Sequence, residues 1–399
     1  MFSRVWTLDP MCFFFPSALK GVFFSFSVTT GKMAEALKPG EEIKPPVTDD
    51  ELPDLVESLY GLKITECKEL VGYDDKNYHL QVSETYSNNY ISELPESGFV
   101  LKILNSMSSA NIDLIEAQNA VIQRIRDNQK TFKHILFPKL VKTRCGKEYI
   151  LQELGEPGKK YAVRLFEYIP GNILHGVSSI PLTLFEEIGS TVGRIDLVLK
   201  GFWHKGYQET KTVWMLDHIE SLEPFLYAVK NESDRTLVSE VIDTFQQNVM
   251  KHYDQFSKGV IHGDFNESNV IVGRHSNCDA GDLHVMGVLD FGDTCQSTYL
   301  FELAITITYA ILQADDLIAG KHVLKGYTKV NPLSQLELQF LKICICARLC
   351  QVLTLGAYNL LQDPGNTYVA GNRPKKWRYL RLLWPMDSNA LLRMWTHDD

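Results

Sequence analysis

The pattern of apolar residues changes near Pro181, and this change constrains the fold more than any other feature of the chain. Before it, short apolar runs between polar turns, such as 62–72 and 77–84, predict β-strands. After it, long segments such as 181–200 and 299–313 have apolar residues at helical spacing. The chain is therefore expected to divide into a β-rich part and a larger helical part.

Chain length and composition support a division into two lobes. The chain has 399 residues, of which 45% are hydrophobic and 22% are charged, so it can bury two cores. A Pro-Gly connector follows the last predicted strand of the β-rich part. We expect an α+β, two-lobed fold with a small β-rich N-lobe over residues 47–168 and a larger, mostly helical C-lobe over 169–399. The active site is expected in the cleft between them.

Residues 1–46 are expected to lie outside this fold, as a disordered extension and leader. The beginning of this segment is rich in Phe, but Asp9, Pro10 and Pro16 interrupt the apolar runs. These runs are far shorter than the ~20 residues of a membrane span. A signal or transit peptide is an alternative. Met33 begins a polar segment that is typical of a cytosolic start.

Charge and cysteine content narrow the possible partners. The formal net charge of -9 does not suggest a nucleic-acid partner, and it is compatible with a cationic small-molecule substrate. No membrane partner is expected, because no segment after the Phe-rich N-terminus is predicted to span a bilayer. Eight cysteines without regular spacing are typical of free thiols in a reducing compartment, so a cytoplasmic location is expected. Cys344, Cys346 and Cys350 follow an apolar helical pattern and are interpreted as core residues rather than metal ligands.

One short polar loop carries the most informative pattern. Residues 260–272 read VIHGDFNESNVIV, with Asp264 and Asn269 between two runs of β-branched residues. Taken alone, the loop is compatible with a turn between two buried strands, in which Asp264 is a turn residue and Asn269 a cap. His262 is expected to brace the loop, and Gly263 to supply a tight backbone or room for a substrate.

Three further residues, in a fixed order along the chain, favour a catalytic interpretation. Lys102 lies on a predicted strand, Glu116 on the helix that follows, and Asp290 at the end of a strand beyond the loop. Phosphoryl transfer from a nucleoside triphosphate needs a lysine on the phosphates, a glutamate that orients it, two Mg²⁺ ligands and a carboxylate for the acceptor hydroxyl. Asp113, one helical turn before Glu116, is the alternative partner of the lysine.

The loop motif differs from that of protein kinases and resembles a related branch. Gly263 stands where protein kinases have arginine, and LVGYDDKNYHL offers only Gly72 in place of a glycine-rich loop. HGDFNESN with a downstream VLDFGD resembles the aminoglycoside phosphotransferase and choline kinase branch of the protein kinase-like fold. Within this branch, the chain is similar to the hydroxylysine kinase family over roughly residues 50–360, through YDDKNYHL, VLKI, IEAQN, HGDFNESNVIV, VLDFGD, FELAITI and ARLCQ.

The resemblance implies a chemical role for each matching residue of the loop. Asp264 would accept the proton of the substrate hydroxyl, and Asn269 and Asp290 would bind Mg²⁺. Members of the family use GTP as phosphate donor and 5-hydroxy-L-lysine as acceptor. These two preferences come from the resemblance alone.

The resemblance also implies a nucleotide site in the N-lobe. Lys102, tied to Glu116, would hold the phosphates. The FEYIPG stretch around Glu167 and Tyr168 would line the base.

Three charged residues of the predicted C-lobe are candidates for substrate contacts. Hydroxylysine carries two ammonium groups and one carboxylate, so its pocket should offer several acids and at least one Arg or Lys. Arg348 is interpreted either as an internal salt bridge to a carboxylate or as a clamp on the substrate carboxylate. Glu302 would meet an ammonium or pair with Arg348. Asp293 is interpreted as a residue behind the metal ligands, a substrate contact or a helix N-cap.

Two other classes of function stay open at this point. One is a kinase for another amino alcohol, such as choline, ethanolamine or homoserine. The other is a catalytically silent binding protein with the same fold, against which the joint presence of Lys102, Asp264, Asn269 and Asp290 argues. The sequence does not define the oligomeric state.

Overall fold

The computed structural model describes residues 43 to 396 of the chain, except for Val71, Tyr73, Glu209, 275–282 and 363–372. Residues 1–42 of the predicted extension and leader lie outside the described residues. From the end of the leader, Ile43 is buried, and its carbonyl oxygen accepts a hydrogen bond from the Ser106 N–H at 3.0 Å.

An antiparallel sheet forms the N-lobe. Its six strands have the order β1-β2-β3-β6-β4, and β5 also pairs with β6. The strands are β1 (Leu62–Leu70), β2 (Lys76–Tyr86), β3 (Phe99–Ile103), β4 (Leu140–Val141), β5 (Ile150–Glu153) and β6 (Lys160–Glu167). Strand β1 lies within the predicted segment 62–72, whereas β2 extends beyond the predicted segment 77–84 at both ends.

The two faces of this sheet have different environments. On β3, Phe99 and Leu101 point into a core that is covered by helix α1 (Leu52–Tyr60). Because side chains alternate along a strand, Lys102 lies on the opposite face, where its cross-strand neighbour is Arg164 of β6. Helix α1 ends at Gly61, which adopts a left-handed φ of 64°. The sheet therefore presents two cations on the face that α1 does not cover.

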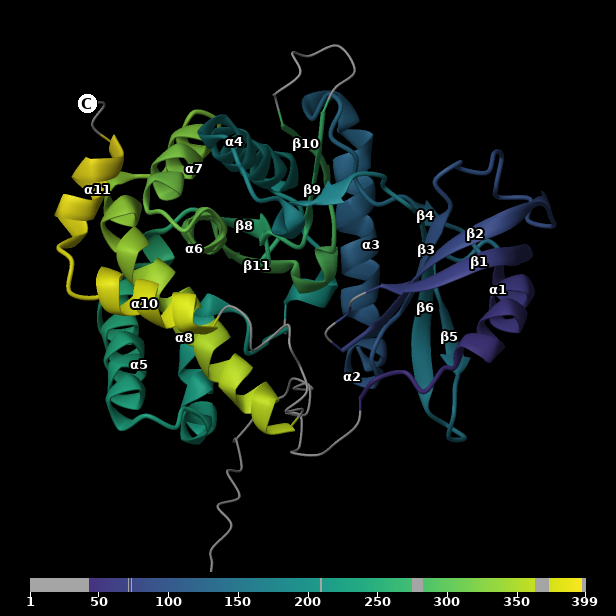
Figure 1. Ribbon diagram of the computed structural model, residues 1–399, viewed down its shortest axis with the longest axis horizontal. Coiled ribbons are helices and arrows are strands. Elements are labelled where there is room, and N and C mark those ends of the chain that lie inside the picture. The colour runs from purple at the N-terminus through teal and green to yellow at the C-terminus, as the bar shows by residue number, and fades with distance from the viewer. Residues whose placement is uncertain are drawn as a thin grey trace, which may run out of the picture.

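Helix α3 (Ile112–Asp127) joins the two lobes. It follows the short helix α2 (Ser106–Ala110) and stands between the sheet and the rest of the molecule (Figure 1). Ile115 packs against residues of the N-lobe, whereas Val121 and Ile125 belong to the large C-lobe core. One helix thus contributes apolar side chains to both lobes.

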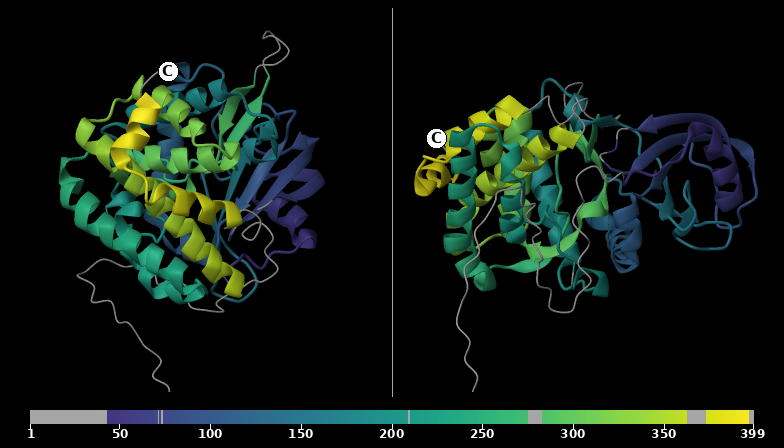
Figure 2. Two further views of the ribbon diagram at one scale, coloured as in Figure 1. Left: turned by 60° about the vertical axis from the view of Figure 1, so that its left-hand side comes forward. Right: turned by 90° about the horizontal axis from the view of Figure 1, so that it is seen from below.

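Long helices make up most of the C-lobe. They are α4 (Leu182–Leu199), α5 (Glu232–Thr244), α6 (Tyr299–Ala314), α7 (Ile318–Thr328), α8 (Gln335–Gln362), α10 (Arg373–Leu383) and α11 (Ser388–Thr396). Seen from below, they group on one side and the N-lobe sheet on the other (Figure 2). The α+β, two-lobed prediction is confirmed, and α7, α10 and α11 are helices that the sequence did not single out.

Helix α8 contains the three clustered cysteines. Cys344, Cys346 and Cys350 have no exposed surface, which confirms that they are core residues. By length and composition α8 could cross a membrane, but 78% of its most apolar window is buried inside the protein, as in a core helix.

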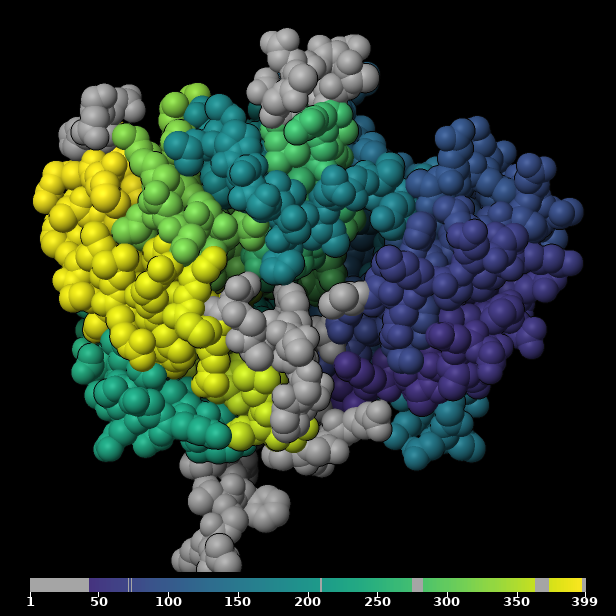
Figure 3. Space-filling view, in the orientation of Figure 1, coloured from purple at the N-terminus to yellow at the C-terminus, as the bar shows by residue number. Residues whose placement is uncertain are grey.

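Two small sheets in the C-lobe carry the functional loops. In one, β9 (Val270–Gly273) pairs with β10 (His284–Val288) and with β7 (Asn172–Ile173). In the other, β8 (Lys258–Ile261) pairs with β11 (Cys295–Thr298). The space-filling view shows the N-lobe and C-lobe meeting along a boundary, with the N-lobe in purple and blue (Figure 3).

Candidate active site

The loop 262–269 connects β8 to β9, and the Asp-Phe-Gly segment that starts at Asp290 follows β10. The Leu289 N–H donates to the Asn269 carbonyl oxygen at 2.8 Å, which fastens the end of the first loop to the start of the second. The pairing of β9 with β10 therefore brings together two motifs that are about twenty residues apart in the sequence.

His262 braces this loop. It has no exposed surface and lies between the rings of Phe265 and Phe291, at centroid distances of 5.4 and 4.8 Å. Its Nδ1 accepts from the Asp264 N–H at 3.3 Å, so Nε2 carries the proton and donates to the Leu289 carbonyl oxygen at 2.9 Å. Burial lowers the pKa of His262, so the ring is neutral and supports the loop through these two hydrogen bonds.

Gly263 occupies a backbone position that only glycine fits. Its φ of 80° is left-handed, and a Cβ there would overlap the Asp293 carbonyl oxygen. Its N–H donates to Glu302 Oε2 at 2.8 Å. The glycine lets the backbone pass between the Asp293 segment and α6.

Asp264 points into the cleft with both carboxylate oxygens engaged. Arg348 Nη2 donates to Oδ1 at 2.7 Å, and the amide groups of Asn266 and Asn269 donate to Oδ2 at 2.7 and 3.2 Å. Its side chain is 22% exposed, so the cleft can still reach it. These donors fix the plane of the carboxylate.

Arg348 lies behind Asp264 rather than in the open cleft. Only 2% of its side chain is exposed, and it also donates to Tyr309 and Gln351 at 3.0 and 3.3 Å. The internal salt bridge is thus the interpretation that the structure supports, with Asp264 as its partner instead of Glu302. Glu302 has no exposed surface and accepts from the Gly263 N–H, and Arg348 pairs with Asp264 instead of Glu302.

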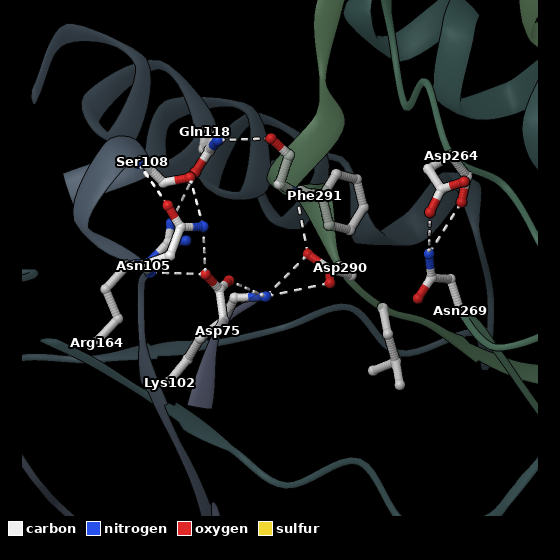
Figure 4. A network of polar contacts seen from close by, with 12 residues as sticks. Asp75, Lys102, Asn105, Ser108, Gln118, Arg164, Asp264, Asn269, Asp290 and Phe291 are labelled. Carbon is white, nitrogen blue, oxygen red and sulfur yellow. Dashed lines mark hydrogen bonds and ion pairs between the residues drawn. The ribbon is translucent and has the colours of Figure 1, made fainter. Parts of the chain in front are cut away.

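Lys102 lies between two carboxylates at the floor of the cleft. Its Nζ is 3.1 Å from Asp290 Oδ2 and 3.2 Å from Asp75 Oδ2 (Figure 4). Asp290 has a left-handed φ of 51° and accepts from the Gly292 N–H at 3.1 Å. Partial desolvation acts to raise the pKa of Asp290, but Lys102 and this N–H hold it below its ordinary value, so the carboxylate is ionised.

The predicted ion pair between Lys102 and Glu116 is not formed, which corrects the sequence interpretation. Glu116 Oε1 accepts from the Tyr149 hydroxyl at 3.3 Å. The α3 residue that reaches the cleft is Gln118, whose Nε2 donates to the Gly292 carbonyl oxygen at 2.7 Å. The reason is helical geometry, because two residues along a helix rotate a side chain by about 200°.

Sequence reasoning missed Gln118 and Arg164 as parts of this site, and it did not pair Asp75 with Lys102. The Arg164 guanidinium donates to Gln118 Oε1 at 3.2 Å and to Asn119 Oδ1 at 3.1 Å, with 3% of the residue exposed. The available signal was the position of Arg164 on a strand otherwise made of apolar residues, in YAVRLF.

Glu167 and Tyr168 lie at the end of β6, where the chain leaves the N-lobe. Glu167 forms an ion pair with Lys139, and Tyr168 stacks on His79 at a centroid distance of 4.0 Å. The Tyr168 N–H donates to the Gly98 carbonyl oxygen at 3.0 Å. Their contact with a nucleotide base stays a prediction.

The donor set fits a hard divalent cation. The Asn269 Nδ2 is directed at Asp264. The side-chain oxygen of Asn269, Oδ1, therefore faces away from that carboxylate, on the side of Asp290 (Figure 4). The Asp290 side chain is 45% exposed. Two oxygen ligands are what Mg²⁺ ordinarily takes from a protein, with water and phosphate completing its shell. Among the described residues, no cluster of three or more His, Cys, Asp or Glu forms a metal site.

Asp293 is the remaining carboxylate of the cleft. It is exposed and lines a small hollow with Gly263 and Trp214. Partial desolvation of its carboxyl group by the surrounding protein, followed by repulsion from Asp264 and Asp290, raises its pKa to about 7. Asp293 is not the N-cap of α6, because Thr298 caps that helix by accepting from the Phe301 N–H at 3.3 Å. The interpretation of Asp293 as a helix N-cap is therefore excluded.

A two-lobed fold with a lysine on the N-lobe sheet, a braced aspartate loop and an ionised Asp-Phe-Gly carboxylate defines a phosphotransferase of the protein kinase-like class.

Known proteins agree with this class. The sequence profile described as "Phosphotransferase enzyme family" matches residues 79–333. The chain is 32% identical to the hydroxylysine kinase of Bos taurus over 92% of this chain and 95% of that protein. It is 30% identical to the hydroxylysine kinase of Mus musculus, over 88% and 93%. A solved structure of amicoumacin kinase hAmiN in complex with AMP-PNP, Ca²⁺ and Ami has a similar fold, with a TM-score of 0.62 and 17% sequence identity. The match covers 86% of this chain and 97% of the kinase chain.

The chain belongs to the phosphotransferase enzyme family, and its relatives over nearly the full length are kinases of a small molecule.

Proposed function

We propose that this protein transfers the γ-phosphate of GTP to the hydroxyl of 5-hydroxy-L-lysine, giving 5-phosphohydroxylysine in hydroxylysine catabolism. The observation that carries the proposal is the similarity to hydroxylysine kinases at 32% identity over 92% of the chain, which spans both lobes and every loop of the site. The use of GTP rests on the resemblance to that family. A cytoplasmic location is part of the proposal, and all cysteines among the described residues are free thiols.

Asp264 is the proposed proton acceptor for the substrate hydroxyl. With Arg348 on one oxygen and two amides on the other, its carboxylate cannot rotate freely. The transition state of phosphoryl transfer is largely dissociative, so the main task of this carboxylate is to orient the attacking oxygen. A fixed carboxylate performs that task without reorganisation during the reaction.

Lys102, Asn269 and Asp290 are the proposed donor-side residues. Mg²⁺, when bound with the nucleotide, neutralises charge on the phosphate oxygens. The side-chain oxygen of Asn269 and the Asp290 carboxylate would hold this ion. Lys102 would place its ammonium against the phosphates, and Glu167 and Tyr168 would lie along the base.

Asp293 is the proposed contact for an ammonium group of the acceptor. Lys102 pairs with Asp290 and Arg348 pairs with Asp264, so Asp293 is the cleft carboxylate left without an ion pair among the described residues. A substrate cation beside it would favour the ionised form of a group whose pKa lies near 7.

A panel of acceptors with labelled GTP and ATP tests the proposal. We expect phosphorylation of 5-hydroxylysine, with GTP preferred, and no reaction of lysine, which lacks the acceptor oxygen. Equal turnover of choline, ethanolamine or homoserine would refute the assignment to 5-hydroxylysine and leave the kinase class standing. Nucleotide binding without turnover of any hydroxylated amine would mark a silent binding protein.

A further inference from the structure

Helix α3 supplies no carboxylate to Lys102. In the general arrangement for phosphoryl transfer, a helix glutamate orients the lysine that holds the phosphates. The α3 side chains next to β3 and β6 are Gln118 and Asn119, whose oxygens accept from Arg164. Glu116 is bonded to Tyr149 instead. The orienting charge for Lys102 must therefore come from another element.

Asp75, in the turn between β1 and β2, provides such a charge. Its Oδ2 lies 3.2 Å from Lys102 Nζ, and its Oδ1 accepts from the Asn105 N–H at 2.8 Å and from Asn105 Nδ2 at 2.9 Å (Figure 4). The side chains of Asp75 and Lys102 are 17% and 14% exposed. One carboxylate oxygen is thus anchored, and the other is presented to the lysine.

The anchor of Asp75 is rigid. Asn105 is the N-cap of α2 and accepts from the Ser108 N–H at 2.9 Å. In the β2–β3 pairing, Lys76 lies opposite Ile103, so the chain of Asp75 is held directly beside the end of β3. The distance from Asp75 to Lys102 is therefore set by a strand register and a helix cap.

Asp290, the second carboxylate at Lys102, has a different proposed role as a metal ligand. A carboxylate that is shared with a divalent cation binds an ammonium more weakly, because part of its charge is already neutralised. Arg164, the cross-strand neighbour of Lys102, adds a repelling positive charge. Burial and Arg164 lower the pKa of Lys102, whereas Asp290 and Asp75 raise it, with a net increase. Asp75 is the partner left to Lys102 once Asp290 is engaged.

We propose that Asp75 is the positioning residue for Lys102 and takes the place of the helix glutamate of other kinases. The inference rests on the proposed kinase function, since it assigns to Lys102 the task of holding nucleotide phosphates. It also places the orienting charge on the residue that directly precedes β2.

The test compares single-charge variants of the full chain. Asp75→Asn keeps an acceptor for Asn105 and removes the charge that faces Lys102. We expect its affinity for the Mg²⁺ nucleotide or its kcat to fall by about 10- to 100-fold, with the KM for the amine acceptor and the thermal midpoint little changed. Asp75→Glu, which restores the charge, should recover part of the loss. Should Asp75→Asn fail to fold, Asp75→Glu is compared with wild type for nucleotide affinity, where a loss without change in acceptor KM is expected.

Two comparators separate this role from general electrostatics. Asp74→Asn removes a charge from the same turn. Glu116→Gln removes the carboxylate that the sequence pattern alone would pair with Lys102. The effect of Asp75→Asn should exceed both. Equal losses in Asp75→Asn and either comparator, or wild-type nucleotide affinity and kcat in Asp75→Asn, would overturn the assignment. Nucleotide affinity is measured without acceptor, so its result stands even if 5-hydroxylysine proves not to be the substrate.

Discussion

Glu302→Gln tests how the catalytic loop is held. Glu302 is fully buried on α6, with Oε2 on the Gly263 N–H and with Oε1 lacking a hydrogen-bond partner among the described residues. Burial raises the pKa of Glu302 from 4.5 to about 7. The structure thus contains an acid that holds a proton at pH values where an exposed glutamate is ionised.

The sign of the effect on stability follows from linkage. Between pH 4.5 and about 7 the folded protein binds a proton at Glu302 that the unfolded chain has lost. The free energy of unfolding must then fall as the pH rises through this window. The full difference in pKa corresponds to about 3 kcal/mol above the native pKa, and local relaxation reduces it to on the order of 1–3 kcal/mol.

Glutamine keeps an acceptor for Gly263 and cannot titrate. We therefore expect the unfolding free energy of wild type to fall by about 1–3 kcal/mol more than that of Glu302→Gln between about pH 5 and about pH 8. Urea denaturation followed by tryptophan fluorescence measures both curves. The comparison uses the slope with pH, because the buried amide itself shifts the absolute stability.

Glu186→Gln is the matched control. Glu186 on α4 is partly exposed, and its ion pairs with Lys329 and Lys325 lower its pKa. Its contribution is lost only as the pH falls through the lowered value, so the slope between about pH 5 and about pH 8 should match wild type. An identical slope for wild type and Glu302→Gln would refute the reasoning on the loop.

Four other substitutions have expected outcomes of different kinds. Gly263→Ala should lower the free energy of unfolding by at least about 1–2 kcal/mol in denaturation, from its left-handed backbone alone, and abolish turnover as the loop shifts. Asp290→Asn should weaken Mg²⁺-dependent nucleotide binding in calorimetry, whereas Asp264→Asn should leave it unchanged. Asp293→Asn should raise the KM of the amine acceptor and not that of the nucleotide. It should also remove a fall in kcat/KM below about pH 7, since the protonated acid cannot pair with an ammonium.

The architecture was predictable because its elements carry strong local patterns. The alternation along β3 and the long apolar run of α6 can be recognised without knowledge of their neighbours. Helix α7 was missed because its packing against α4 depends on small residues, as at Gly326, where a Cβ would overlap the Glu186 carbonyl oxygen. Such a close approach between two helices leaves little trace in periodicity.

The site was predictable where its chemistry lies on contiguous loops. Asp264 and Asp290 are in motifs whose flanking strands pair locally. The partner of Lys102 could not be predicted, because the choice between Glu116 and Asp75 depends on the rotation of α3 and on the β2–β3 register. Distant side chains such as Arg348, on a separate helix, can be matched to a carboxylate only in three dimensions.

The most direct test of the central claim is the rate of phosphate transfer from GTP to 5-hydroxylysine by wild type and by Asp264→Asn, followed by ³¹P NMR. The account predicts a phosphomonoester on the hydroxyl-bearing carbon with wild type, and a rate about 10²- to 10⁴-fold lower with Asp264→Asn. A variant that turns over at the wild-type rate would show that the loop is only a turn between strands and would contradict the mechanism.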